Sequence, residues 1–430
     1  MYSEVEREFN VVYPENENAT YVSLLNYSSE GENPFQRWYR YKEGFSVQFI
    51  EKIVEEYRTN ENDVLLDPFA GSGTTLVAAN RLGYDGIGYE VNPFSYFLMK
   101  TKIQGYNEEE CRRFKSDYKR IIRELREDSL EDYTLPELSI SAKVFQPEAE
   151  KYMMSCKTKI CKLTKDKVWD LLFLGWLSSI EELSDYRKAG NGLKRRKTVK
   201  PIIVGKEDVI RKLEQQFSYM AYDLDKIENN NFTNRIQNKS SLNFGTDVEK
   251  NSVDGIIFSP PYANCFDYTE IYKLELWFGD FVSSYSDMKV LRNRSLKSHL
   301  NIKYEDTNIH STKSDLFNSV IDRVSQSELW DKRIPKMLNG YFEDMFNIID
   351  NCYSTLKEGG FCAIVVGNSA YGGEVVPTDL ILADYARRIG FYVDKIEVDR
   401  YIITSSQQYE KTKKQGKYLR ESVVCLKKQK

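Results

Sequence analysis

The sequence predicts an α/β protein with a mostly parallel sheet that carries two mainly helical insertions. Apolar runs typical of buried strands, such as residues 63–66 and 254–258, alternate with runs of helical periodicity. The first of these strands leads through a glycine-rich turn into a helix that we expect to end at Gly83. This order is the start of a βαβ nucleotide-binding unit. The alternation breaks over residues 105–235 and 263–340, which we assign to the insertions.

Capping residues and periodicity predict the other elements. Ser46 is expected to cap a helix that starts at Val47, and Asn107 with Glu110 forms a capping box that opens a charged helix. In chain order the remaining expected elements are a strand over residues 84–90, helices over 169–183 and 206–227, a glycine-rich basic loop over 188–197, a helix that ends at 359–360, a strand over 361–366, a helix over 377–389 and an antiparallel strand pair over 391–402 and 422–426.

The glycine-rich turn spans Asp67 to Thr75 and reads Asp-Pro-Phe-Ala-Gly-Ser-Gly-Thr-Thr. Gly71 and Gly73 let the backbone approach a ligand closely, because no Cβ blocks it. The turn lacks the Gly-Lys-Ser/Thr ending of a phosphate loop. It is therefore expected to bind a nucleotide-like cofactor in another way.

A second motif, Ser259-Pro260-Pro261-Tyr262, follows the strand over residues 254–258. Consecutive prolines stiffen a loop, since each ring locks φ and restricts the residue before it. We expect the loop to lie at the carboxyl end of its strand, where open α/β sheets bind ligands.

Together the two motifs resemble motifs I and IV of the amino-group DNA methyltransferases, which modify N4 of cytosine or N6 of adenine. In that family motif IV begins with Asp, Asn or Ser, and Ser is more typical of the N4-cytosine enzymes. The resemblance implies a Rossmann-like class I S-adenosylmethionine-dependent methyltransferase fold, a mixed and mostly parallel seven-stranded sheet with an antiparallel last strand. It covers residues 35–104, 236–275 and 341–426, so the catalytic core is expected in residues 1–104, 236–262 and 341–430.

The resemblance implies S-adenosyl-L-methionine as the cofactor. The loop residues expected to contact it are Asp67, Pro68, Phe69, Gly71, Gly73, Thr74 and Thr75. Asp67 would accept a hydrogen bond from the amino group of the cofactor or from a bound water. Glu90 lies about 20 residues beyond the loop, at the end of the next strand, where an acidic residue takes the ribose hydroxyls. Asn92 follows it as in the family.

Two further segments resemble cofactor motifs of the family. Residues 37–46 resemble motif X, which would bring Phe45 and Ser46 to the methionine part of the cofactor; an aromatic-rich docking helix is the competing interpretation. Asn238 occupies the place of motif III, whose usual residue is Asp.

The resemblance also implies a mechanism without a metal or a covalent intermediate. The exocyclic amine of a base cannot be reached inside the duplex, so the base must be flipped out. Tyr262 would stack on it, while Ser259 and the Pro260 carbonyl would accept hydrogen bonds from the amine. The nitrogen lone pair then attacks the sulfonium methyl in line. The Pro-Cys nucleophile of carbon-5 cytosine enzymes is absent, and Cys265 is expected to be a packing residue.

Two basic clusters are expected to contact DNA phosphates. The first comprises Lys194, Arg195 and Arg196, for which a solvated surface is an equally weighted alternative; the second comprises Arg292, Arg294 and Lys297. Since the formal net charge is -4, a DNA enzyme of this composition must concentrate its cations locally.

Composition limits the remaining possibilities. The longest apolar run, residues 168–177, is too short to span a bilayer and contains Asp170. The seven cysteines include no C-x-x-C pair, and His299 and His310 lie far from Cys156 and Cys161. These observations predict a reduced, cytoplasmic protein without a metal site.

The predicted function is site-specific methylation of double-stranded DNA, most strongly at N4 of cytosine, with a cognate restriction endonuclease as a partner by family analogy. N6-adenine methylation is the first alternative. An RNA methyltransferase, or a non-catalytic DNA-reading subunit, is the second. An idle subunit predicts an eroded cofactor loop, whereas the loop here is intact.

Overall fold

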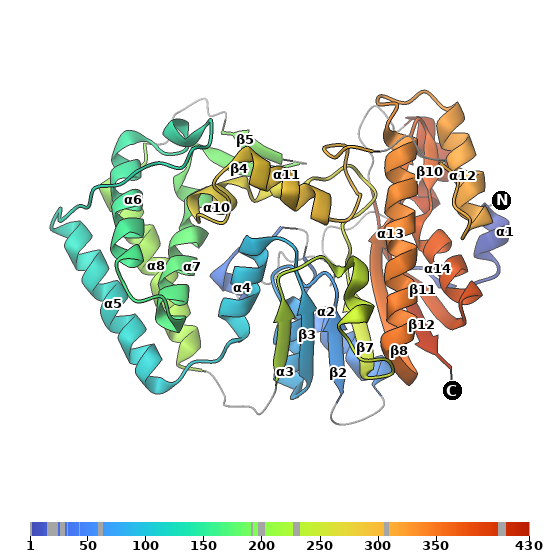
Figure 1. Cartoon of the computed structure of the whole chain (residues 1–430), viewed down its shortest axis with the longest axis horizontal. Coiled ribbons are helices and arrows are strands. Elements are labelled where there is room, and N and C mark those ends of the chain that lie inside the picture. Colours follow the sequence, from blue (N-terminus) through green and yellow to red (C-terminus); the bar gives the residue numbers. More distant parts are fainter. Residues whose placement is uncertain are drawn as a thin grey trace.

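The computed structural model describes residues 2–14, 25, 31, 33–42, 44–58, 63–190, 192–196, 203–226, 233–304, 309–402 and 410–429. Within these ranges one eight-stranded sheet has the order β1-β11-β12-β8-β7-β2-β3-β6 (Figure 1). Its strands are β1 (Val11–Val12), β2 (Val64–Asp67), β3 (Asp85–Tyr89), β6 (Asn234–Gln237), β7 (Val253–Phe258), β8 (Leu356–Gly367), β11 (Phe391–Tyr401) and β12 (Arg420–Lys428).

The topology of the sheet confirms the predicted fold class. β6, β3, β2, β7 and β8 run parallel, while β12, the last strand, lies antiparallel between β8 and β11. β1 adds an eighth, two-residue edge strand to the seven expected ones, because Asn10 O accepts a hydrogen bond from Ile396 N on β11. The terminal strand pair and the strands before both motifs lie where the sequence predicted them.

Helices cover both faces of the sheet. Successive strand residues point to opposite faces, so Leu65 and Ile257 pack in one core and Leu66 and Ile256 in the other. The helices of the core are α1 (Tyr2–Glu6), α2 (Val47–Tyr57), α3 (Thr74–Leu82), α4 (Pro93–Ile103), α13 (Ile334–Thr355) and α14 (Thr378–Arg388). In the described ranges no helix combines the length and apolar character needed to cross a membrane.

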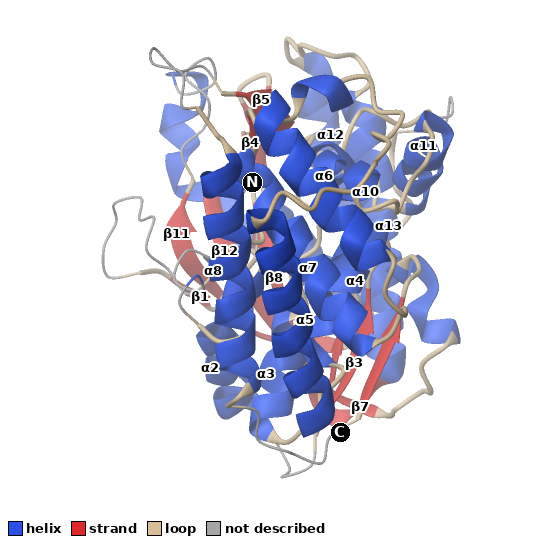
Figure 2. Cartoon of the chain, turned by 90° about the vertical axis from the view of Figure 1, so that its left-hand side faces the viewer, coloured by secondary structure: helices blue, strands red, loops and turns tan. Residues whose placement is uncertain are grey.

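The first insertion forms a separate helical layer with its own hydrophobic core. Its helices are α5 (Glu108–Arg126), α6 (Pro147–Cys161), α7 (Lys167–Leu183) and α8 (Lys206–Leu224). Figure 2 shows these helices in front of the sheet when the molecule is viewed from their side. The predicted Asn107–Glu110 capping box is present at the start of α5. At Gly175 a Cβ would lie 2.6 Å from the ring of Phe217, so α7 and α8 approach closely.

Two sequence predictions are corrected by backbone pairing. The expected glycine-rich basic loop is a hairpin of β4 (Tyr186–Ala189) and β5 (Gly192–Arg195), although Lys197 lies outside the described residues. The helix expected to stop at 359–360 ends at Thr355, and β8 runs through both glycines. A Cβ on Gly360 would lie 2.8 Å from Asp254 O, so this glycine serves the close pairing of β7 with β8.

The second insertion divides between the two halves of the molecule. α9 (Tyr268–Ile271), α10 (Lys273–Phe278) and α11 (Tyr285–Arg294) pack in the helical layer. α12 (Asp315–Gln326) packs instead with α13 and α14 on the sheet. In Figure 1 the β4–β5 hairpin, α10 and α11 extend over the top, between the helical layer and the sheet.

Candidate active site

The predicted site residues meet at one edge of the sheet. Asp67 ends β2, Glu90 follows β3, Asn238 follows β6 and Ser259 follows β7. Because these four strands are parallel, their carboxyl ends lie side by side. Phe69 of the glycine-rich loop stacks on Phe258, with ring centroids 5.6 Å apart, and this contact joins the two motifs.

Asp67 holds the glycine-rich loop together. It is 1% exposed, its Oδ1 accepts from Phe69 N at 2.9 Å, and its Oδ2 accepts from Thr75 Oγ1 at 2.6 Å. Burial raises the pKa of this carboxyl to about 7. Gly71 and Gly73 both have positive φ, +51° and +81°, as the tight loop requires. The contacts of Asp67 in the structure thus stabilise the glycine-rich loop. Its expected contact with the cofactor stays a prediction.

Glu90 links the loop to the next helix. Its Oε2 accepts from Gly71 N at 2.9 Å and its Oε1 accepts from Asn92 N at 2.7 Å. Burial raises the pKa of Glu90 to about 7. Each carboxylate oxygen has a further lone pair, so both can still accept from a vicinal diol.

A small pocket surrounds Glu90. Its walls include Pro68, Phe69, Gly71, Glu90, Asn92, Ser240, Ser259, Pro261, Arg294 and His299. Asn92 caps α4 through its Oδ1, but its Nδ2 is buried with no hydrogen-bond partner among the described residues. Asn92 Nδ2 is thus a buried donor that needs an acceptor, and it lies beside the Glu90 carboxylate, which can bind a diol. Both groups suit the polar edge of a nucleoside. The residues present therefore fit the adenosine part of S-adenosylmethionine.

A large cleft of about 630 Å³ lies on the other side of the Ser-Pro-Pro-Tyr loop. Its lining includes Ser259 and Tyr262 of this loop and, from the helical insertion, Glu181, Lys188, Lys212 and Gln216. Tyr41, Ser259 and Tyr268 line both the small pocket and the large cleft. These three residues therefore stand between the small pocket, of about 100 Å³, and a wider cavity of about 630 Å³.

Within the loop, Ser259 Oγ donates to Tyr262 OH at 3.4 Å, and Tyr262 OH donates to Glu421 Oε1 at 2.5 Å. Burial raises the pKa of Tyr262 well above its usual value. Cys265 is partly buried, and its Sγ lies 3.5 Å from Tyr371 OH, as befits the expected packing residue.

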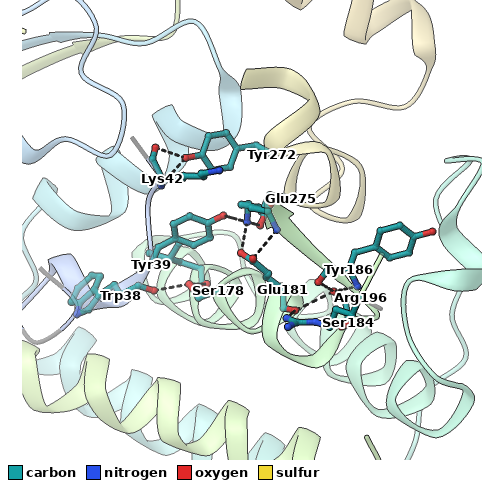
Figure 3. Close-up of polar contacts among 12 residues, drawn as sticks. Trp38, Tyr39, Lys42, Ser178, Glu181, Ser184, Tyr186, Arg196, Tyr272 and Glu275 are labelled. Carbon is teal, nitrogen blue, oxygen red and sulfur yellow. Dashed lines mark hydrogen bonds and ion pairs between the residues drawn. The ribbon is translucent and has the colours of Figure 1, made fainter. Parts of the chain in front are cut away.

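Residues 35–42, here called the N-terminal strap, run between the loop and the helical insertion. Ser178 Oγ donates to Trp38 O at 2.6 Å, Tyr39 OH donates to Glu275 Oε1 at 2.7 Å, and Lys42 N donates to Tyr272 OH at 3.1 Å (Figure 3).

The strap also reaches the cofactor loop. Tyr41 stacks on Tyr272 at a centroid distance of 5.0 Å, and a Cβ on Gly71 would lie 3.2 Å from Tyr41 OH. Since Lys188 Nζ contacts Tyr39 OH at 2.8 Å and Glu275 Oε1 at 2.5 Å, the β4–β5 hairpin is fastened to the same strap.

Phe45, Ser46 and Asn238 do not line the small pocket, and their expected contacts with the cofactor stay predictions. Phe45 lines the large cleft, and Ser46 Oγ accepts from Phe49 N as the cap of α2. Asn238 is exposed, and its Nδ2 donates to Glu90 O at 2.8 Å, so it joins two strand ends. Ser240 and Ser241, which sequence reasoning missed, line the small pocket from the same turn.

The second basic cluster is held by contacts inside the protein. Arg292 pairs with Asp267 and Glu270, and Lys297 Nζ lies 2.8 Å from Asp344 Oδ1. Arg294 lines the small pocket. Arg292 and Lys297 thus neutralise carboxylates of the protein itself, and the expected contact of the cluster with DNA phosphates stays a prediction.

The first basic cluster is exposed on the hairpin. Arg195 lies 3.4 Å from Asp185, and Arg196 donates to Ser184 O and Glu181 O. Lys194 is exposed on β5. Of the two clusters, this one stays available to an external anion.

The fold and the site define a class I S-adenosylmethionine-dependent methyltransferase. The protein combines three features of this class: a sheet with an antiparallel last strand, a glycine-rich loop after β2, and an acidic residue after β3.

Comparison with known proteins narrows this class. The model of the family described as "DNA methylase" matches residues 7–101. The chain is 28% identical over 424 residues to Type II methyltransferase M.BsoBI of Geobacillus stearothermophilus, covering 87% of this chain and 82% of the relative. It is 29% identical over 406 residues to Type II methyltransferase M.AvaI of Anabaena variabilis, covering 87% and 83%. The matched family model and these relatives support assignment of the chain to the amino-group DNA methyltransferases, and its cofactor is S-adenosylmethionine.

A solved structure of a geranyl diphosphate methyltransferase in complex with GPP and sinefungin aligns with 98% of this chain and 88% of its own, at a TM-score of 0.31 and 6% identity.

Cofactor binding is expected to tighten as the pH is raised through about 7, the pKa of Glu90. Ribose hydroxyls donate to the ionised carboxylate, so binding favours that form and releases the proton that Glu90 holds at lower pH. Calorimetric titration with S-adenosylmethionine over a pH series measures this. Glu90→Gln should lose most of the pH dependence; an unchanged dependence would assign it to Asp67 instead.

Proposed function

We propose that the protein is a site-specific DNA methyltransferase that modifies the exocyclic amine of a flipped base, N4 of cytosine in the first place. The observation that carries this proposal is the position of Ser259, which lines both the small pocket and the large cleft. A methyl group must pass in line from a cofactor in one cavity to an amine in the other. Ser259 stands at the boundary that this transfer has to cross.

The residues of the loop suit an amine substrate. The Ser259 hydroxyl and the Pro260 carbonyl are acceptors for the amine hydrogens, and two such bonds orient the nitrogen lone pair toward the methyl. Tyr262 lines the cleft and would stack on the flipped base. Bound S-adenosylmethionine supplies the electrophilic methyl. Positioning and fixed dipoles then account for the rate enhancement.

We assign residues 1–104, 236–262 and 341–430 to the catalytic core, and the helical insertion 105–235 to recognition of the target. This role is supported because residues of α7, α8 and the hairpin line the same cleft as Tyr262. In the second insertion, residues 291–299 face the small pocket, which favours a role in enclosing the cofactor.

Two relatives are named Type II methyltransferases. We therefore propose a restriction–modification setting for this chain as well, with a cognate restriction endonuclease as the partner.

The test is to incubate the protein with labelled S-adenosylmethionine and unmethylated mixed-sequence DNA, digest the DNA to nucleosides and identify the labelled one by mass. N4-methylcytosine supports the proposal. N6-methyladenine keeps the mechanism and overturns the base assignment. Label in RNA alone, or cofactor binding without transfer to either nucleic acid, would favour the RNA enzyme or the idle subunit.

Arg40 is expected to contact a DNA phosphate at the mouth of the large cleft. It is exposed, it lines the cleft, and its guanidinium has no ion pair in the described part of the chain. Arg40→Ala should weaken binding to all sequences and reduce the slope of log K against log salt by about one unit. Fluorescence anisotropy over a salt series measures the slope. Arg58→Ala, at the exposed end of α2, is the matched control, and an equal change in both variants would contradict the assignment.

A further inference from the structure

The hydroxyl of Tyr262 belongs to a chain of polar contacts that ends on the terminal strand pair. Tyr262 OH donates to Glu421 Oε1 at 2.5 Å, and Arg400 Nε donates to Glu421 Oε2 at 2.5 Å. Glu421 is 4% exposed, so each of its two oxygens faces one of these donors in a nearly water-free environment. Arg400, Glu421, Tyr262 and Ser259 all line the large cleft.

The strand register brings these residues together. Arg400 on β11 is paired with Glu421 on β12, and Glu421 is paired in turn with Gly367 at the end of β8. A Cβ on Gly367 would lie 2.7 Å from the ring of Tyr262. The ring therefore rests on a glycine while its hydroxyl is held one strand further along. Both the plane and the direction of the ring are fixed by the sheet.

A buried carboxylate needs a cationic partner, because desolvation otherwise disfavours its charge. Burial raises the pKa of Glu421, and the Arg400 guanidinium opposes this shift. Arg400 thus helps to keep Glu421 as an acceptor, and because Arg400 Nε donates to Oε2, Oε1 is left to the tyrosine hydroxyl.

We propose that Glu421 and Arg400 are positioning residues of methyl transfer that act through the hydroxyl of Tyr262. They hold the tyrosine ring in the orientation in which it stacks on the flipped base, and so align the amine with Ser259. The inference rests on the proposed function, since it assigns a role in that reaction. Residues 400 and 421 belong to neither motif, and they lie 138 and 159 residues beyond Tyr262 (400 − 262 and 421 − 262).

A double-mutant cycle tests whether the two residues act through one hydroxyl. Tyr262→Phe and Glu421→Ala are each expected to lower kcat about tenfold, the effect of one hydrogen bond to a charged group, with unchanged affinity for S-adenosylmethionine. The double variant should lose no more than either single variant, because the same contact is removed in all three. Glu421→Gln, which keeps an acceptor for the hydroxyl, should recover most of the activity.

Glu397→Gln is the matched control. Glu397 lies on the same strand pair and forms ion pairs with Lys52 and Lys395, but it does not line the cleft. The kcat of the Glu397→Gln variant should equal that of the wild type.

Losses that multiply in the double variant, or an unchanged kcat in Tyr262→Phe, would overturn the positioning role. If Glu421→Ala does not fold, Tyr262→Phe decides alone, because that change keeps the ring and removes only the contact. Failure of the wild-type protein to methylate any DNA would overturn the proposed function and this inference with it. Transfer by the wild type with unaffected variants would overturn the inference only.

Discussion

Replacement of Tyr262 by Ala is expected to lower methyl transfer to DNA by about 10- to 100-fold, the worth of one base–aromatic stack. Tyr262 lines the large cleft and is absent from the walls of the small pocket, so affinity for S-adenosylmethionine should stay unchanged. Single-turnover transfer to DNA, with calorimetric titration of the cofactor, separates the two effects. Tyr392→Ala, an exposed tyrosine on β11, is the control. Unchanged transfer by Tyr262→Ala would exclude stacking by this residue.

The second large effect is expected at Glu90. Glu90→Ala removes the acceptor for Gly71 N and Asn92 N as well as the proposed ribose contact. We expect the Kd for S-adenosylmethionine to rise about 10- to 100-fold, since hydrogen bonds to a charged group contribute about 1.5–3 kcal/mol. Equilibrium dialysis with labelled cofactor measures this directly.

Glu109→Ala on the exposed first turn of α5 provides the comparison for Glu90→Ala. If both variants bind the cofactor equally well, Glu90 only shapes the loop and another residue holds the ribose. Recovery of cofactor binding in Glu90→Asp would show that the negative charge matters more than the length of the side chain.

Local signals in the sequence were sufficient for the catalytic core. The glycine-rich loop, the Ser46 cap and the strand before Ser259 depend on neighbours within a few residues, and the structure confirms each of them. The carboxyl ends of β2, β3 and β7 meet because parallel strands dictate it. For this reason the sequence could place both motifs at one edge of the sheet.

The missed features depend on contacts between distant segments. The ion pairs of Arg292 with Asp267 and Glu270 join residues 25 and 22 positions apart, and the sequence did not predict them. Tyr41 and Tyr268 border both cavities, yet 227 residues separate them (268 − 41). The β4–β5 hairpin was taken for a loop, because its polar, basic strands lack the alternation that marks a half-buried strand. No pattern of neighbouring residues indicates which distant segments come into contact.

The N-terminal strap ties the helical layer, to which we assign target recognition, to the rest of the chain. Asp223 on α8 accepts hydrogen bonds from Phe35 N and Trp38 Nε1 and pairs with Arg37, while Gln216 on the same helix donates to Trp38 O. The helical layer is therefore no detachable module joined only at residues 104 and 236. A transplant of this layer into another enzyme, or its replacement by a foreign one, would have to carry residues 35–42 along, or the buried Asp223 would lose its partners.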